Sequence, residues 1–301
     1  MGSILDFLGN IPQYLANGLA NGCIYILVAM GFNIIYSSTG IINFAQGEFS
    51  MFGGLLAFTL AVTLGLPLPV AIILAIVACA LIGGVTERLV IYPLRNASIL
   101  AAIIATIGVS IFYKAIGRLF WPEEAYKVPD FTTGNINLPR VTVSTQFLWV
   151  LALTVLTVIL TYLFFNYTKA GKAMRACSVN RQAASLAGIN VSHMSLYSFV
   201  LAGALGGLAG FINAPFAKYS GGLTLGIKGF TAAVVGGLGN TFGAVAGGLV
   251  LGLSEELIAG FLTVVLGWSS GFKDAVAAIL LILVLLWRPQ GILGKGEVQK
   301  V

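Results

Sequence analysis

The chain has 301 residues, of which 58% are hydrophobic and only 9% are charged, with a formal net charge of +6. Soluble domains carry roughly 25% charged residues, so this composition excludes a soluble enzyme or binding domain. One membrane crossing takes about 20 mostly apolar residues, and about seven to eight such stretches fill most of the chain. We therefore predict an all-α membrane protein, a polytopic bundle of transmembrane helices that forms one domain over residues 1–301.

In chain order, the predicted spans cover residues 13–37, 43–64, 68–92, 99–121, 147–167, 194–215 and 272–287. A polar stretch at 122–146 follows the fourth span, and a basic segment at 168–193 follows the fifth. The region 227–261 is also apolar, but polar and flexible positions interrupt it at Gly236, Gly237, Gly239 and Asn240. Such an interruption is typical of a discontinuous helix or of a re-entrant hairpin that turns inside the membrane.

The distribution of Lys and Arg predicts the orientation, because cytoplasmic loops carry an excess of both. The segment 168–193 has four basic residues and no acid, and the short loop near Arg88 and Arg95 also leans positive. The C-terminal tail adds Arg288, Lys295 and Lys300. We expect these three parts to face the cytoplasm, and the acidic 122–146 stretch and the N-terminus to face outward. The predicted location is the bacterial inner membrane, crossed several times.

Many of the 38 glycines stand four residues apart, as in the pairs Gly203–Gly207 and Gly206–Gly210. Small residues at this spacing line one helix face and let two backbones approach closely in lipid. Tight helix packing explains most of them. The cluster Gly236 to Gly239 is the exception that favours a functional role, because it interrupts a helix.

Charged residues inside a membrane are costly and are functional candidates. Glu48 is the clearest, with Asn43 and Gln46 just before it at the start of the second span. One interpretation is that Glu48 contacts substrate directly. The alternative is a structural role, in which Glu48 lies near the cytoplasmic interface or pairs with another helix. Lys228 is interpreted as a pore-mouth charge or as a lysine that extends to the interface.

Four further charges lie near predicted span ends, at Glu255, Glu256, Lys273 and Asp274. We expect Glu255 and Glu256 to be solvated near the outer surface. The three cysteines, Cys23, Cys79 and Cys177, are predicted to be free thiols.

No enzyme constellation is present in the sequence. His193 is the only histidine, which excludes His-based metal clusters and Ser-His-Asp triads. No stretch matches the phosphate-binding P-loop, since Gly171-Lys172 is followed by Ala173. We therefore expect no cofactor on this chain, and the positive charge is explained by cytoplasmic loops and not by nucleic-acid binding.

The segment 168–193 is the most informative part outside the membrane. It is rich in Ala, Arg and Leu and reaches Gly188, which is typical of a short helix capped by glycine. A short helix across the cytoplasmic face could present a protruding knob to a partner's groove. A solvated linker that only keeps the positive charge inside is the equal alternative.

Five stretches carry a family resemblance: residues 40–48, 171–177, 183–190, 230–239 and 288–294. Along nearly its whole length, the chain resembles the membrane permease of a branched-chain amino acid ABC importer, the LivH type. The family's usual His in the first motif is Gln46 here, which leaves the role of that side chain open.

The resemblance implies a pore made with a second, homologous permease, two ATPase subunits on the cytoplasmic face and a periplasmic substrate-binding protein. Residues 183–188 are similar to the coupling helix that such permeases insert into an ATPase groove, which favours the partner interpretation. The implied coupling residues are Gly171, Arg175, Arg181, Ala183, Ala184, Leu186 and Gly188. The implied translocation path passes Asn43, Gln46, Glu48, Gly236, Gly237, Gly239 and Asn240.

Two rival functions stay open at this point. Related permeases share these motifs, so the cargo could be urea, short amides or other amino acids. A stand-alone secondary transporter or channel would also suit Glu48 and the interrupted helix. Against it, no dense set of acids within the membrane suggests an ion-coupling relay, and the chain shows no clear internal repeat.

Overall fold

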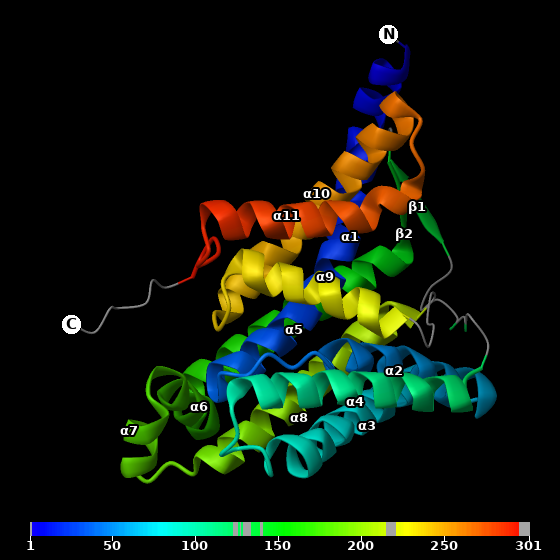
Figure 1. Ribbon diagram of the computed structural model, residues 1–301. Helices are drawn as coiled ribbons and strands as arrows, with labels where there is room; N and C mark the ends of the chain where they lie inside the picture. Colours follow the sequence, from blue (N-terminus) through cyan, green and yellow to red (C-terminus); the bar gives the residue numbers. More distant parts are fainter. Residues whose placement is uncertain are drawn as a thin grey trace.

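The computed structural model describes residues 2–122, 126, 128, 134–138, 141–214 and 221–294. The helices of its first half are α1 (Gly2–Thr39), α2 (Gln46–Phe58), α3 (Leu68–Thr86), α4 (Ile99–Phe120) and α5 (Thr145–Tyr167). Those of its second half are α6 (Lys169–Val179), α7 (Arg181–Leu186), α8 (Val191–Ile212), α9 (Gly221–Gly236), α10 (Thr241–Leu266) and α11 (Lys273–Trp287). Two π-helical turns, Thr59–Thr63 and Glu87–Ile91, extend α2 and α3 (Figure 1).

Six helical segments are long and apolar enough to cross a membrane. They are α1, α3 with its π-helical extension, α4, α5, α8 and α10. The helices α9 and α11 have only 16 and 15 residues, fewer than the roughly 20 that a full crossing needs. The prediction of a polytopic helical membrane protein is confirmed, and the chain is a multi-pass membrane protein.

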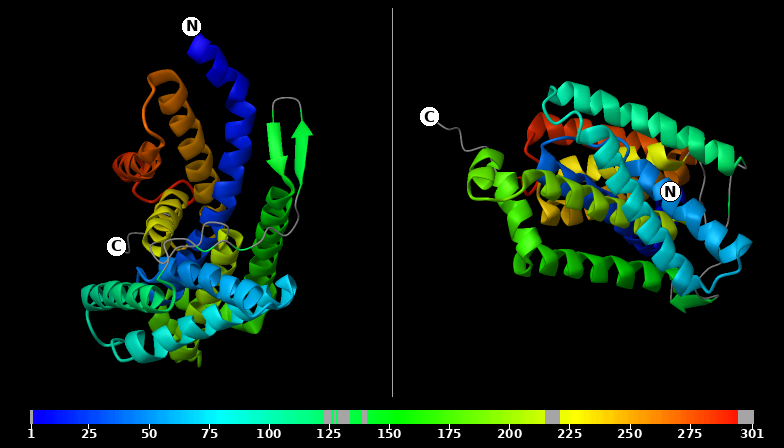
Figure 2. Two further views of the ribbon diagram at one scale, coloured as in Figure 1. Left: turned by 90° about the vertical axis from the view of Figure 1, so that its right-hand side faces the viewer. Right: turned by 90° about the horizontal axis from the view of Figure 1, so that it is seen from below.

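The helices form a buried centre and an outer layer. Helices α1 and α8 are mostly enclosed by other helices, whereas α3, α4 and α5 bury only a small share of their surface. Their outward residues are large and apolar, for example Leu81 and Ile111, which are 65% and 67% exposed. A helix that is apolar on all sides needs lipid or protein around it, and lipid can cover the outward face of these helices. Figure 2 shows α4 and α5 on opposite sides of the bundle.

Close packing at the centre depends on glycine, as the four-residue spacing predicted. On α8, Gly203 and Gly207 lie against Cys79 of α3, and Gly206 lies against Phe49 of α2. A side chain at Gly203 would collide with the backbone carbonyl of Cys79. The glycines on α8 thus allow α2 and α3 to approach it from two sides.

The interrupted region is a helical hairpin. Helix α9 ends at Gly236 and α10 begins at Thr241, and Gly236 packs directly against the backbone of Gly243. Gly237 has φ +111°, a conformation that residues with a side chain rarely adopt. The glycines therefore make a turn between two antiparallel helices, and α10 after the turn is itself long enough for a full crossing.

The first helix is longer than predicted, since α1 begins at Gly2 and not at residue 13. Gln13, at the predicted boundary, has several hydrogen-bond partners. Gln13 donates to Asn17 one turn later, at 3.1 Å. It also donates to the carbonyl of Thr142 and accepts from its amide, at 3.2 and 2.9 Å. Thr142 lies on a small hairpin of β1 (Asn135–Leu138) and β2 (Val141–Ser144), which stands beside α1 in Figure 2.

The predicted cytoplasmic segments gather at one end of the molecule. Arg181 at the start of α7 contacts the end of α1, and Asn240 in the α9–α10 turn contacts Leu293 after α11. The segment 168–193, predicted as one short helix, is two helices separated at Asn180. Several charges used for the orientation lie outside the described residues: Glu123, Glu124, Lys127, Asp130, Arg140, Lys295 and Lys300.

Candidate translocation path and coupling segment

Glu48 is a buried carboxylate where α2, α4 and α9 meet. Its side chain is on the first turn of α2, and the residue is 1% exposed. Its Oε1 accepts a hydrogen bond from Ser110 Oγ of α4 at 3.0 Å. Its Oε2 has no hydrogen-bond partner among the described residues and packs against Gly222 of α9. One oxygen of a buried carboxylate is therefore left without a hydrogen-bond partner in the part of the chain that the structure describes.

The turn before α2 holds this carboxylate in place. Asn43 Oδ1 accepts from the Ala45 amide at 3.1 Å, and Thr106 Oγ1 of α4 accepts from the Phe44 amide at 3.2 Å. These bonds satisfy backbone donors that precede the helix. Asn43 is completely buried, and its Nδ2 has no partner among the described residues.

Gln46 is placed differently from its two neighbours in the motif. Its Nε2 donates to the Ala202 carbonyl of α8 at 3.0 Å, and its amide packs against Gly31 of α1. The side chain is fully buried between α1 and α8. Gln46 therefore joins two central helices, while Glu48 points to the other side of α2.

The turn at Gly236 to Asn240 is locked by contacts with α1 and with the chain after α11. Asn33 Oδ1 accepts from the Gly239 amide at 3.2 Å, and its Nδ2 donates to the Asn240 carbonyl at 2.7 Å. Ile292 donates from its amide to Val235, at 2.8 Å. Asn240 itself caps α10 by accepting from the Phe242 amide at 3.0 Å. Sequence reasoning missed Asn33, although an amide side chain within an apolar span was visible.

The predicted path residues therefore fall into two groups. Glu48 touches α9 at Gly222, near its start, whereas the glycine turn begins at Gly236, at its end. Fourteen residues of α-helix separate these contacts by about 21 Å. The two groups can border one path along α9, but they do not form one binding site.

Glu255 contradicts the prediction of a solvated surface acid. It is 1% exposed, accepts from Tyr25 Oη at 2.7 Å and pairs with Lys228. Lys228 also pairs with Asp274 at 2.9 Å. Lys228 lies inside α9, and its side chain is only 12% exposed. A low-dielectric interior strengthens such pairs, which explains why these charges are tolerated.

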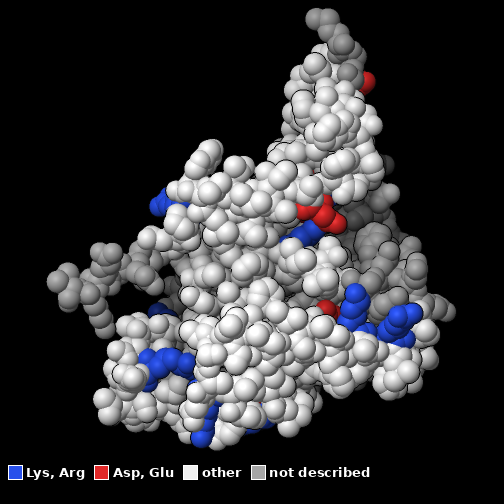
Figure 3. Space-filling view, in the orientation of Figure 1, with Lys and Arg blue, Asp and Glu red and all other residues white. Residues whose placement is uncertain are grey.

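Glu256 contradicts the same prediction, since it is 5% exposed. Its Oε1 accepts from Lys273 at 2.6 Å and from Asn21 at 2.8 Å. Figure 3 shows the largely uncharged surface of this face, with acidic and basic atoms in contact near its upper middle. Together the two acids join α10 to α1, α9 and α11. Their partners lie far away in sequence, so no local pattern could reveal them.

Helix α7 projects from the bundle together with α6, at the lower left of Figure 1. Asn180 caps it by accepting from the Ala183 amide at 3.0 Å, and Gly188 follows it with φ +83°. Ala184 is 4% exposed and faces the protein, whereas Leu186 is 91% exposed. A leucine exposed to this degree is left almost uncovered by the described part of the chain.

The other predicted coupling residues hold the two short helices to the bundle. Gly171 allows α6 to pack on the backbone of Phe164. Arg175 donates to Asn166 Oδ1 at 3.0 Å, and Arg181 donates to the Thr39 carbonyl at 2.9 Å. Ala183 is exposed on α7. The predicted set therefore contains an outer surface, at Leu186, and a group that ties this surface to the spans.

The three cysteines are free, as predicted, and all are buried. Cys177 lies on α6 and is 1% exposed. Burial raises the pKa of its thiol, and the nearby charge of Arg181 partly offsets this. No group of His, Cys, Asp or Glu among the described residues could hold a metal ion.

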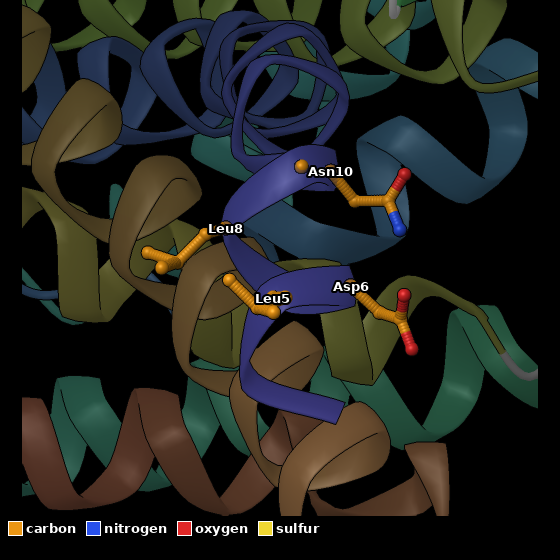
Figure 4. Close-up of a pocket in the computed structure, with 5 residues that line it drawn as sticks. Leu5, Asp6, Leu8 and Asn10 are labelled. Atoms are coloured by element: carbon orange, nitrogen blue, oxygen red, sulfur yellow. The ribbon is translucent and has the colours of Figure 1, made fainter. Parts of the chain in front are cut away.

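The hollow near the N-terminus offers no comparable site. It is lined by five residues of α1 alone: Leu5, Asp6, Leu8, Gly9 and Asn10. Figure 4 shows Leu5 and Leu8 on one side of the helix and Asp6 and Asn10 on the other. Because no second element contributes, the polar groups do not converge on a ligand.

Comparison with known proteins gives a consistent result. The family described as "Branched-chain amino acid transport system / permease component" matches residues 14–285. The LivH permease of the high-affinity branched-chain amino acid transport system of Escherichia coli K12 is 34% identical over 96% of this chain and 97% of its own. The BraD permease of Pseudomonas aeruginosa is 37% identical with the same coverage.

A solved structure, PsaBC from Streptococcus pneumoniae in complex with Fab, shares the fold. The TM-score is 0.53 at 14% sequence identity, over 95% of this chain and 97% of that chain. At this identity the likeness concerns the helix arrangement alone.

Proposed function

Because the chain belongs to the family of permease components of branched-chain amino acid transport systems, we propose that it is the membrane-spanning subunit of an ATP-driven importer of branched-chain or other hydrophobic amino acids. The whole chain forms one permease domain. The observation that carries this function is the family match over residues 14–285.

In this proposal, ATP hydrolysis takes place on two partner ATPase subunits at the cytoplasmic end. A second homologous permease completes the pore, and a periplasmic binding protein delivers the amino acid. The sequence of this chain contains no P-loop, which supports placing ATP hydrolysis on separate subunits. The LivH and BraD relatives are named as permease proteins of high-affinity transport systems, which also supports a multi-subunit machine.

Helix α7 is the proposed contact with an ATPase subunit. Leu186 supplies the apolar anchor, and its 91% exposure supports a partner that covers it. Arg181 and Arg175 connect this contact to Thr39 on α1 and Asn166 on α5. When ATP closes the ATPase pair, movement of α7 therefore reaches α1 directly and α5 by way of α6, and the bundle rocks between inward-facing and outward-facing states.

Glu48 is the proposed polar contact along the translocation path. Its Oε2, which has no hydrogen-bond partner among the described residues, lies at the junction of α2, α4 and α9. Helix α9 is too short there to cross the bilayer by itself. A carboxylate there can accept a hydrogen bond from the ammonium group of an amino acid. Asn43 Nδ2, for which the described residues supply no acceptor, offers a donor in the same motif.

The test has two stages. The tagged chain is first isolated in mild detergent, and its partners are identified by mass spectrometry. Co-purification of two ATPases and a second permease is expected, whereas a lone chain would favour a channel or secondary transporter. The purified complex and its binding protein are then placed in proteoliposomes, and uptake of labelled leucine is compared with that of urea and acetamide. ATP-dependent urea uptake without leucine uptake would overturn the proposal that the cargo is an amino acid.

A further inference from the structure

An open cavity of about 920 Å³ lies beneath α7, at the end of the bundle that we assign to the cytoplasm. Its walls come from the end of α1, the π-helical end of α3, the loop between α3 and α4, and the stretch from α7 to the start of α8. Small-molecule sites occupy roughly 300–1,000 Å³. The cavity is therefore large enough for an amino acid, and it separates the coupling helix from the spans.

Opposite charges line this cavity. Arg95 stacks over the Tyr92 ring at 4.6 Å, and Arg181 extends from α7 to the Thr39 carbonyl. Glu87, on the π-helical turn, is 1% exposed. Its Oε2 lies 3.8 Å from Arg88 Nε but accepts no hydrogen bond among the described residues. The cavity thus has two guanidinium groups for an anion and one buried carboxylate for a cation.

The remaining lining favours an apolar side chain on the ligand. Ile41, Ile91 and Ile189 line the cavity together with the charged residues, and Ile91 is 4% exposed. Ser192, also in the lining, has a buried hydroxyl without a hydrogen-bond partner among the described residues. A free α-amino acid with an aliphatic side chain matches this combination of carboxylate-binding, ammonium-binding and apolar surfaces.

We propose that this cavity is a regulatory site in which imported aliphatic amino acid binds from the cytoplasm and slows further import. The inference rests on the proposed function, because the ligand is the product of that transport. A bound amino acid joins α7, through Arg181, to the α3 end and the α3–α4 loop, through Glu87 and Arg95. It then opposes the movement of α7 that ATP binding requires, so product accumulation lowers both ATP hydrolysis and uptake.

The complete complex in proteoliposomes tests this, with binding protein and labelled leucine outside and ATP inside. Vesicles are loaded with unlabelled L-leucine, with 4-methylpentanoate, which lacks the ammonium group, or with 3-methylbutylamine, which lacks the carboxylate. Internal L-leucine is expected to lower the initial uptake rate about fivefold, a usual strength for coupling between sites. The two analogues are expected to act much more weakly. Inhibition by 4-methylpentanoate equal to that by leucine would overturn the role of Glu87.

Variants assign the effect to the cavity. E87Q and R95A are expected to transport into empty vesicles but to lose inhibition by internal leucine, and R95K is expected to retain part of it. K169A changes an exposed cationic side chain outside the cavity lining and serves as the matched control. If internal leucine still inhibits both E87Q and R95A fully, the assignment of the regulatory site to this cavity is wrong. If empty vesicles of the unmodified complex take up no leucine, the proposed function fails; if they do and internal leucine has no effect, only this inference fails.

Discussion

Glu48 Oε1 on α2 and Ser110 Oγ on α4 lie 3.0 Å apart, and this hydrogen bond joins the two helices directly. Beside it, the Phe44 amide before α2 donates to Thr106 Oγ1, and Trp121 Nε1 after α4 donates to Thr59 Oγ1 after α2. Helix α4 buries little of its surface elsewhere. The carboxylate of Glu48 therefore both faces the proposed path and holds a peripheral helix to the centre.

The first prediction concerns this pair. Glu48→Gln removes the charge while keeping the shape, and we expect leucine uptake by the reconstituted complex to fall about tenfold, since a hydrogen bond to a charged group contributes about 1.5–3 kcal/mol. Ser110→Ala should cost less, because Glu48 keeps its charge. Ser254→Ala, a serine of α10 that bonds only to its own helix in the described contacts, is the control. Normal uptake by E48Q would remove Glu48 from the path.

The second prediction concerns the exposed leucine of α7. Leu186→Asp replaces the apolar anchor by a charge, and a lost anchor of this kind costs about 2 kcal/mol or more, about 30-fold in affinity. We expect the ATPase subunits to dissociate during purification and ATP-driven uptake to be lost. Lys172→Asp, on the exposed side of α6, is the control. Retention of the ATPases at wild-type level in L186D would contradict the docking of α7.

The third prediction concerns the residue after α7. Gly188 has φ +83° and open space around it, so a substitution meets backbone strain of roughly 1–2 kcal/mol but no collision. Gly188→Glu is expected to uncouple ATP hydrolysis from uptake, as is Arg175→Glu, which breaks the bond to Asn166. Hydrolysis and uptake are measured on the same vesicles. Normal uptake per ATP in both variants would contradict their place in coupling.

The fourth prediction concerns the buried pair of Lys228 and Glu255. Glu255→Leu leaves Lys228 without its buried partner, and breaking such a pair costs about 3–5 kcal/mol. The double variant Lys228→Met with Glu255→Leu removes both charges and should recover part of the lost thermal stability in detergent. The single variant Lys228→Met completes the comparison. If the stability lost in the double variant equals the sum of the losses in Glu255→Leu and Lys228→Met, the pair contributes no coupling energy.

The fifth prediction concerns the reactivity of Cys177. Its pKa is raised by burial, so at a given pH a smaller fraction is the reactive thiolate than for an exposed cysteine. In a chain without Cys23 and Cys79, we expect alkylation by iodoacetamide at pH 8 to be at least about tenfold slower than at Ser178→Cys with Cys177→Ala. Ser178 is the exposed neighbour. Equal rates would show that α6 does not stay packed against the bundle.

The sequence by itself determined the class of structure and most of the crossings. Low charge and long apolar stretches permit only a membrane-embedded helical chain, because each backbone group in lipid must be bonded within the same segment. The glycine interruption at Gly236 and the cap at Gly188 were also visible, because these positions depend on local backbone conformation. The family resemblance rested on motifs that are contiguous in the chain.

Only the tertiary structure decided which polar groups are buried together. Glu255 finds Tyr25 at a separation of 230 residues, and Asn33 finds the Gly239 amide at a separation of 206. Neither pairing has a local signal, so two acids predicted to be solvated turned out to be buried. The same holds for the cavity beneath α7, where Glu87, Arg95 and Arg181 come from separate segments. Sequence periodicity places a residue on its own helix, but the partners of a buried charge depend on how the helices pack.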